Sequence, residues 1–352
     1  MKFGPVPARD AAGAVLAHSV QIGGRKFKKG RVLSDEDAAA LAEAGAEEVT
    51  VARLDADDVP EDEAARRIAH ALAPDPAARA LTVSAPFTGR ANLYAAEPGV
   101  LEVDEGAVDA LNALDEAVTL ATLAPFARVA ARQMVATVKI IPYAAPGAAV
   151  AEAERLAAAG EILRVHPPAR HSASLVCTAT PGMKPAVVEK GAQAVRERMA
   201  ALGLAAAGEE VVPHETAALA GAIARAGGEM VLVLTGSATS DRADVGPAAL
   251  GAAGGKLERV GMPVDPGNLL FLGRTGAPAR PVIGLPGCAR SPKLNGADWV
   301  LERIACGLEV TGADIAAMGV GGLLKEIPAR PSPRAGGGET PEARRPVVSV
   351  VL

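Results

Sequence analysis

The sequence predicts an α/β protein in which a three-layer domain, a mainly parallel sheet with helices on both faces, follows a mixed α+β N-terminal region. Two observations predict this class. From about residue 170, short apolar runs alternate with helical stretches long enough to cross between parallel strands. In addition, only 2% of the 352 residues are aromatic although 49% are hydrophobic. The cores are therefore expected to consist of small aliphatic side chains, on which helices can pack closely.

The first helix is predicted directly after Ser34. This residue precedes DEDAAALAEAG, so its hydroxyl can accept a hydrogen bond from the first turn, and Asp35 and Asp37 favour the positive end of the helix dipole. Gly45 supplies the left-handed residue that ends the helix. The stretch EEVTVARL, residues 47–54, is predicted to form a strand.

The middle of the chain shows a mixed pattern of helices and strands. A second amphipathic helix is predicted over EDEAARRIAHALA (61–73), where Pro74 stops it. A helix at AVDALNALDEA (107–117), a strand at MVATVKIIPY (134–143) and a helix at AVAEAERLAAAG (149–160) follow.

Regular alternation begins near residue 170. The apolar runs predicted as strands are SASLVCTAT (172–180), AGEEVV (207–212), MVLVLTG (230–236) and PVIGLPG (281–287). The predicted helices between and after them are 186–203, 215–228, a stretch after residue 244, and 296–308. This order predicts a mainly parallel sheet, in which ligands bind at the carboxyl ends of the strands.

These patterns divide the chain into four parts. Residues 1–56 form an α+β segment, 57–165 a mixed α/β region and 166–325 the sheet domain. Residues 326–352 are rich in Pro, Gly and charge and poor in apolar side chains, so a disordered tail is predicted there.

Composition narrows the range of partners. The net charge of −5 provides no basic surface, which argues against nucleic acid or an anionic membrane as the main partner. Cys177, Cys288 and Cys306 lack CxxC or Cys/His spacing, which argues against a disulfide framework and a structural zinc site. No apolar stretch reaches the length of a membrane span before charge or Pro interrupts it. A cytoplasmic protein with a small-molecule ligand is predicted.

Three loops at strand ends carry the candidate site. They are LTGSATSDRAD (234–244), GMPVDPGNLL (261–270) and GLPGCARSPKLNG (284–296). Small residues there let backbone amides face an anion, and a following helix adds its positive end. No GxGxxG or Walker sequence is present. The alternative is that each loop is a plain turn, and that Asp241 and Asp244 only cap the next helix.

The first loop resembles the T-G-G-x-S-x-G-x-x-D loop of the molybdopterin-binding domain shared by molybdopterin molybdotransferases and adenylyltransferases. Thr235, Gly236, Ser237, Thr239 and Asp244 fall on its Thr, two Gly, Ser and Asp positions. Asp241 stands where the last Gly would be.

The other two loops extend the resemblance over about 160 residues. Pro266, Gly267 and Asn268 match part of a Pro-Gly-x-Pro stretch, in which Asp265 replaces a Lys. Gly284 to Gly287 match a G-L-P-G-N-P loop, with Cys288 in place of the Asn. Residues 27–51 are also similar to the N-terminal part of the molybdotransferases, whose S-x-M-D-G-Y segment and C-terminal barrel are absent.

The resemblance implies a bound molybdopterin or molybdenum cofactor, together with Mg²⁺ if phosphoryl chemistry occurs. Asp244 is then the catalytic and metal-binding residue. Arg242, Arg290 and Lys293 supply countercharges for a phosphate. The implied cofactor-binding residues are Thr235, Gly236, Ser237, Thr239, Asp241, Pro266, Gly267, Asn268, Pro286, Gly287, Cys288, Arg290 and Ser291.

Three functions stay open on the sequence alone. The first is a non-catalytic carrier of molybdopterin or of the finished cofactor, and the absent segments favour it. The second is an enzyme that inserts molybdate into the pterin or nucleotidylates it, for which Asp244 is the candidate residue. The third is a binding module for another phosphorylated heterocycle. The expected protein partners are a molybdoenzyme, another cofactor-assembly protein or a second copy of the chain.

Overall fold

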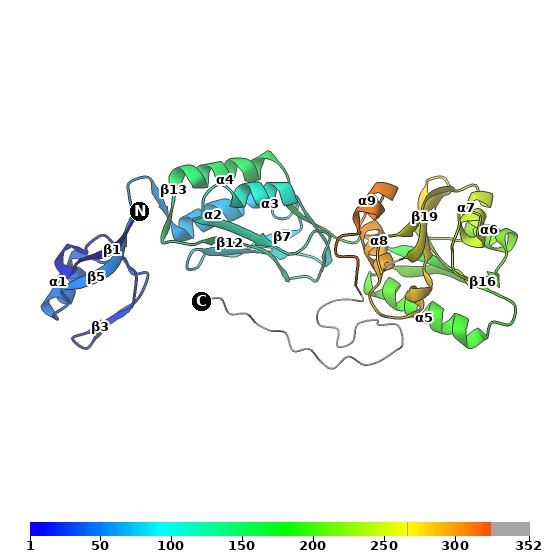
Figure 1. Ribbon diagram of the computed structural model, residues 1–352, viewed down its shortest axis with the longest axis horizontal. Helices are drawn as coiled ribbons and strands as arrows, with labels where there is room; N and C mark the ends of the chain where they lie inside the picture. Colours follow the sequence, from blue (N-terminus) through cyan, green and yellow to red (C-terminus); the bar gives the residue numbers. More distant parts are fainter. Residues whose placement is uncertain (266, 325–352) are drawn as a thin grey trace, which may run out of the picture. The chain divides into compact units, whose positions relative to one another are not determined.

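The structure is a computed structural model that describes residues 1–265 and 267–324. The described chain contains both helices and strands along its whole length, consistent with the predicted α/β class in general (Figure 1). Pro266 and the predicted tail, residues 326–352, lie outside the described residues.

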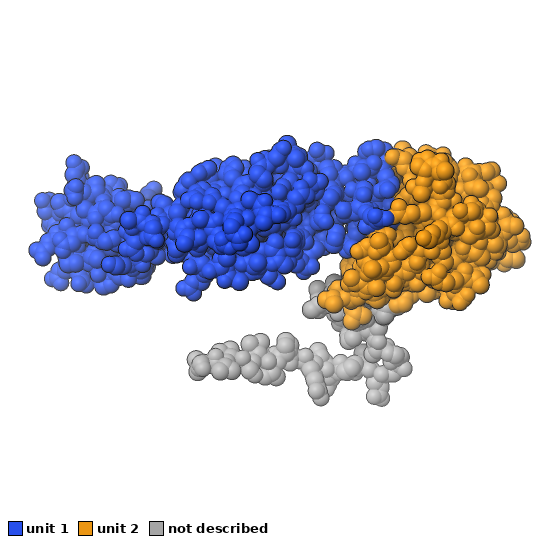
Figure 2. All heavy atoms as spheres, turned by 90° about the horizontal axis from the view of Figure 1, so that it is seen from above, with its two compact units in different colours: residues 1–171, 302–309 blue, residues 172–301, 310–352 orange. Residues whose placement is uncertain are grey.

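Contacts divide the described chain into two compact units (Figure 2). Unit 1 comprises residues 1–171 and 302–309, and unit 2 comprises residues 172–301 and those from 310 onward. The segment 302–309 therefore packs with unit 1, although the sequence placed it in the domain 166–325.

The N-terminal part of unit 1 has its own small core. Helix α1 (Asp35–Glu43) begins with the predicted cap: Ser34 Oγ accepts the Asp37 amide at 3.1 Å, and Asp37 Oδ2 accepts the Ser34 amide at 3.3 Å. Gly45 ends it with φ of +93°. An antiparallel sheet in the order β1-β5-β2 and the hairpin β3–β4 complete this part. The strands are β1 (Lys2–Pro7), β2 (Val15–Leu16), β3 (Val20–Ile22), β4 (Arg25–Phe27) and β5 (Glu48–Arg53).

The middle part of unit 1 packs three helices on short antiparallel sheets. The sheet orders are β10-β12-β8-β7, β11-β9-β14 and β13-β6. The helices are α2 (Glu61–Leu72), α3 (Glu105–Asn112) and α4 (Gly147–Ala159). The strands are β6 (Asp58–Pro60), β7 (Leu81–Val83), β8 (Arg90–Ala95), β9 (Gly99–Val103), β10 (Val118–Thr122), β11 (Arg128–Val129), β12 (Met134–Ile140), β13 (Ala144–Pro146) and β14 (Leu163–His166).

Unit 2 contains a six-stranded sheet in the order β16-β15-β17-β20-β19-β18. The first four strands run parallel, and β19 and β18 run antiparallel to their neighbours. The strands are β15 (Ser172–Ala179), β16 (Ala205–Pro213), β17 (Met230–Leu234), β18 (Lys256–Met262), β19 (Asn268–Thr275) and β20 (Arg280–Leu285). The mainly parallel sheet was predicted. The two antiparallel edge strands were not, because β18 is half exposed and its pairing shifts register twice.

Helices cover both faces of this sheet, as all five residues of β17 are buried. Val231 and Val233 pack in one cluster with α6 (Thr216–Arg225) and α7 (Val245–Ala252). On the opposite face, a Cβ added to Gly191 in α5 (Pro185–Ala201) would stand 3.0 Å from the Leu234 side chain. Helices α8 (Gly296–Ala305) and α9 (Gly312–Ala317) follow (Figure 1).

Candidate functional site

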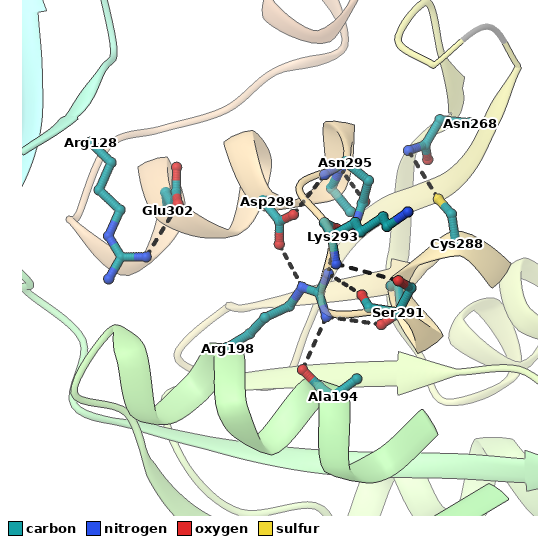
Figure 3. A network of polar contacts seen from close by, with 12 residues as sticks. Arg128, Ala194, Arg198, Asn268, Cys288, Ser291, Lys293, Asn295, Asp298 and Glu302 are labelled. Carbon is teal, nitrogen blue, oxygen red and sulfur yellow. Dashed lines mark hydrogen bonds and ion pairs between the residues drawn. The ribbon is translucent and has the colours of Figure 1, made fainter. Parts of the chain in front are cut away.

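The three predicted loops meet at one edge of the unit 2 sheet. Strands β17 and β20 are parallel and β19 is antiparallel to β20, so the carboxyl ends of β17 and β20 lie beside the beginning of β19. Arg290 Nη2 donates a hydrogen bond to the Thr235 carbonyl at 2.7 Å. Asn268 Nδ2 donates to Cys288 Sγ at 3.9 Å (Figure 3). Each loop therefore contacts at least one of the others.

A buried threonine holds the loop after β17. The Gly236 amide donates to Thr178 Oγ1 at 2.7 Å, and Thr178, in β15, is fully buried. A Cβ at Gly236 would stand 2.8 Å from the Thr178 carbonyl oxygen, so no larger residue fits there. Thr235 Oγ1 donates to the Ser237 carbonyl at 2.7 Å and tightens the turn. Thr235 and Thr239 are buried and Ser237 is exposed.

His214 also contacts the threonine that holds this loop. Its Nδ1 lies 2.8 Å from Thr178 Oγ1. Because Oγ1 already accepts the Gly236 amide, the threonine hydroxyl hydrogen can point to Nδ1. Thr178 and His214 were not predicted as site residues from the sequence. The available signal was that both lie at the carboxyl ends of neighbouring parallel strands, β15 and β16.

The two aspartates of the loop shape the loop itself. Asp244 Oδ2 accepts the amides of Ser240 and Asp241, the latter at 2.8 Å. Asp241 Oδ1 accepts the Ala243 amide at 2.8 Å, so the alternative that it caps α7 is wrong. Within residues 1–265 and 267–324, no three His, Cys, Asp or Glu side chains are grouped so that they could hold a metal ion.

A pocket of about 300 Å³ opens beside the third loop. Its lining contains two cationic side chains and no carboxylate, and residues Gly287, Cys288, Arg290 and Ser291 belong to the predicted site. Lys190, on α5, was not predicted, because a single lysine on a helix carries no sequence signal. The lining residues are Val187, Lys190, Gly191, Gly287, Cys288, Arg290, Ser291 and Pro292.

Arg290 crosses from this pocket to the first loop over a glycine of α5. A Cβ at Gly191 would stand 2.8 Å from Arg290 Nη1, so the glycine makes room for the guanidinium. Gly287 is exposed and has open space around its Cα, whereas Pro286 is buried. Of the other predicted residues, Gly267 is exposed and Asn268 is buried, with Asn268 Oδ1 accepting the Leu270 amide at 3.1 Å.

An arginine whose side chain is 10% exposed holds the third loop in place (Figure 3). All five N–H groups of Arg198, in α5, are used. Nε donates to Asp298 Oδ1 at 2.6 Å. The other four donate to the carbonyls of Ala194, Ala289, Ser291 and Lys293 at 2.7–3.1 Å. Three of these carbonyls belong to the loop, so Arg198 sets its shape.

The three cysteines differ in environment. Cys177 and Cys306 are buried, and burial raises the pKa of each thiol from 9.0 to about 11. Cys288 is half buried and lines the pocket. It is therefore the cysteine that a pocket ligand would shield.

Comparison with known proteins gives a match in the N-terminal part of the chain. Residues 5–53 match a domain family of unknown function, DUF8806. No curated protein matches the chain. Among the helices of the described residues, none is long and apolar enough to cross a membrane.

Proposed function

We propose that unit 2 binds molybdopterin or the molybdenum cofactor at the joined loops, with the phosphate in the pocket, and that the chain is a carrier. The observation that carries this proposal is the meeting of three separately predicted loops beside a pocket with two cations. Lys190 and Arg290 attract an anion, and Gly287 leaves its backbone open to a close approach. In this proposal, the carrier serves a cytoplasmic molybdoenzyme or cofactor-assembly protein.

The hydrogen bonds and the position of Asp244 favour a carrier over a transferase. Its Oδ2 accepts two backbone amides, and the residue does not line the pocket. The other carboxylate oxygen, Asp244 Oδ1, is the atom through which this residue could contact a cation. If Mg²⁺ bound there, Asp244 would hold it and it would supply charge for phosphoryl transfer.

The test is to purify the full chain from a host that makes molybdopterin, oxidise it, and measure fluorescent pterin and molybdenum. Pterin with molybdenum indicates the finished cofactor, and pterin alone indicates molybdopterin. Chain purified without pterin from such a host would contradict the proposal.

The variant Lys190→Met tests whether the phosphate of the ligand lies in the pocket. Loss of one charge-assisted contact is expected to weaken pterin binding roughly 10-fold or more. Lys256→Met is the matched control, because Lys256 begins β18 at the opposite end of the sheet. Equal pterin content in both variants and the wild type would place the phosphate elsewhere.

A further inference from the structure

The hairpin β3–β4 of unit 1 forms a basic surface, although the net charge of the chain is −5. Residues 11–34, which include this hairpin, contain five Lys and Arg residues and no Asp or Glu. Arg25, Lys26 and Lys28 are exposed, and none of their side chains forms an ion pair with another residue that the structure describes. Phe27 packs in the core of the N-terminal part and so fixes the hairpin. The hairpin therefore holds three cations at the surface with their charges uncompensated by the described chain.

A second surface of unit 1 is acidic. A pocket of about 510 Å³ is lined by Asp58, Asp115 and Glu116 and, among the described residues, by no Lys, Arg or His. The Met1 ammonium pairs with Asp58 at 2.8 Å, whereas no cation of the described chain pairs with Asp115 or Glu116. Ile141 also lines the pocket and is 61% exposed. A large aliphatic side chain in solvent, with polar groups around it, is a feature of surfaces that bind another protein.

The basic and the acidic surface are neighbours within unit 1. Lys29 follows the hairpin, and its Nζ lies 5.7 Å from the centre of the Tyr143 ring. The Tyr143 hydroxyl donates to the Ala17 carbonyl at 2.8 Å. Tyr143 stands between Pro142 and Ala144, which both line the pocket. The end of the hairpin therefore lies next to the rim of the acidic pocket.

We propose that the chain forms a two-fold dimer through unit 1, in which the hairpin of each copy binds the acidic pocket of the other. A two-fold interface brings the same surface of both copies together, so this surface must be complementary to itself. Adjacent basic and acidic patches meet that condition, because the rotation places the cations of one copy opposite Asp115 and Glu116 of the other. Nucleic acid is a less suitable partner, since the carboxylates beside the hairpin repel its phosphates. The dimer is independent of pterin binding in unit 2.

Charge reversal in the full chain tests the dimer by sedimentation velocity at low and high salt. The wild type is expected to be dimeric at low ionic strength and to dissociate as salt screens the charges. The hairpin variant, Lys26→Glu with Lys28→Glu, should weaken the dimer roughly 10-fold or more. The pocket variant, Asp115→Lys with Glu116→Lys, should weaken it to a similar degree. A mixture of the two variants should form a dimer again, because each hairpin then meets a pocket of opposite charge.

The matched control is Lys184→Glu with Lys256→Glu, which reverses two exposed charges of unit 2 and should leave the dimer unchanged. A wild type that is monomeric at low ionic strength overturns the proposal, and binding of an RNA oligonucleotide by that monomer would assign the hairpin to nucleic acid. A mixture of the hairpin and pocket variants that stays monomeric overturns the pairing of hairpin with pocket.

Cross-linking measures the contact between copies directly. A carbodiimide joins a lysine amine to a carboxylate when the two groups are in contact, and it is applied to a mixture of unlabelled and isotope-labelled wild-type chains. Links from Lys26 or Lys28 to Asp115 or Glu116 should connect labelled with unlabelled peptides. Links found only between peptides of the same label would place the hairpin on the pocket of its own chain, and they would overturn the dimer.

Discussion

Phe271 occupies a slot that two glycines leave open. A Cβ at Gly284 would stand 1.9 Å from Phe271 Cε1, and one at Gly246 would stand 2.6 Å from the same atom. Phe271 is among the largest fully buried side chains in a protein with five phenylalanines. The first glycine of GLPG therefore has a packing role in addition to its match with a binding motif.

Gly284→Ala is expected to destabilise unit 2 by about 3 kcal/mol or more, because Phe271 must leave its rotamer or the strands must separate. Unfolding in urea can be followed by the fluorescence of Trp299, the only tryptophan, which lies in α8. Gly287→Ala is the control, since nothing lies within 4 Å of its added Cβ. Equal unfolding midpoints for the two variants would contradict this account of the slot.

Substitution of Asp244 distinguishes between a carrier and an enzyme. Asp244→Asn keeps an oxygen that can accept the Ser240 and Asp241 amides but removes the charge that a metal needs. A carrier should keep its pterin and most of its stability, whereas Asp244→Ala should lose about 1–2 kcal/mol. Assays of molybdate insertion and nucleotidyl transfer decide the point. Activity that is present in the wild type and lost in Asp244→Asn would establish the enzyme.

The thiol of Cys177 makes stability depend on pH in the alkaline range. Burial raises its pKa to about 11, while the unfolded chain releases the proton near 9.0. Between these values the folded state binds more protons, so the stability from this group falls as pH rises from 9 to 11. The loss amounts to about 2–3 kcal/mol. Urea titrations followed through Trp299 should give a shallower pH dependence for Cys177→Ala, and an unchanged one would be inconsistent with this cause.

At the scale of elements, α5 organises the candidate site. It supplies Lys190 to the pocket, Gly191 as the passage for Arg290, and Arg198 as the support of the third loop. The Arg198–Asp298 ion pair is almost buried, with side chains 10% and 11% exposed. Asp298 Oδ2 also accepts the Asn295 amide at 2.8 Å, so the pair connects α5 with the beginning of α8.

Arg198→Met is expected to destabilise unit 2 by about 3–5 kcal/mol, because it leaves the Asp298 charge buried without its partner. Arg198→Lys keeps the charge but not the five-donor geometry, so its effect should be intermediate. The fluorescence of Trp299 during unfolding in urea measures the stability of both variants. If Arg198→Met unfolds at the wild-type midpoint, the ion pair and hydrogen bonds of Arg198 contribute no stability.

The elements with local signals were predictable, and the contacts between elements were not. Helix α1 was predicted with both ends, because Ser34, Asp37 and Gly45 act within a few residues of one another. The loops of the candidate site were found because small residues follow apolar runs. The roles of Thr178 and Arg198 depend on partners 58 and about 100 residues away, so no spacing in the sequence indicates them.

At the scale of the whole molecule, unit 1 is built from two stretches of chain. The second stretch, 302–309, is fixed by several contacts: Glu302 pairs with Arg128 at 3.6 Å, and the Arg303 guanidinium lies 3.7 Å from the centre of the Phe126 ring. The Ala305 carbonyl accepts the amides of residues 169 and 170. Ile304, Ala305 and Cys306 are buried.

A fragment of residues 1–171 is therefore expected to be less stable than unit 1 in the full chain. A synthetic peptide of residues 300–311 should bind this fragment and raise its Tm by several degrees. A peptide with Glu302→Ala and Arg303→Ala should bind more weakly. Circular dichroism during heating measures the effect, and a Tm that neither peptide changes would show that the segment is dispensable.

The discontinuous unit 1 also sets an order of events on the ribosome. Residues 1–171 emerge first, but their last structural component is translated about 130 residues later. At the usual elongation rate this delay is roughly 7–26 s. During that time the nascent N-terminal region lacks a part of its core, while the sheet of unit 2 is being completed. Chaperone contact should therefore be concentrated in this interval, and it should end when residue 309 leaves the exit tunnel.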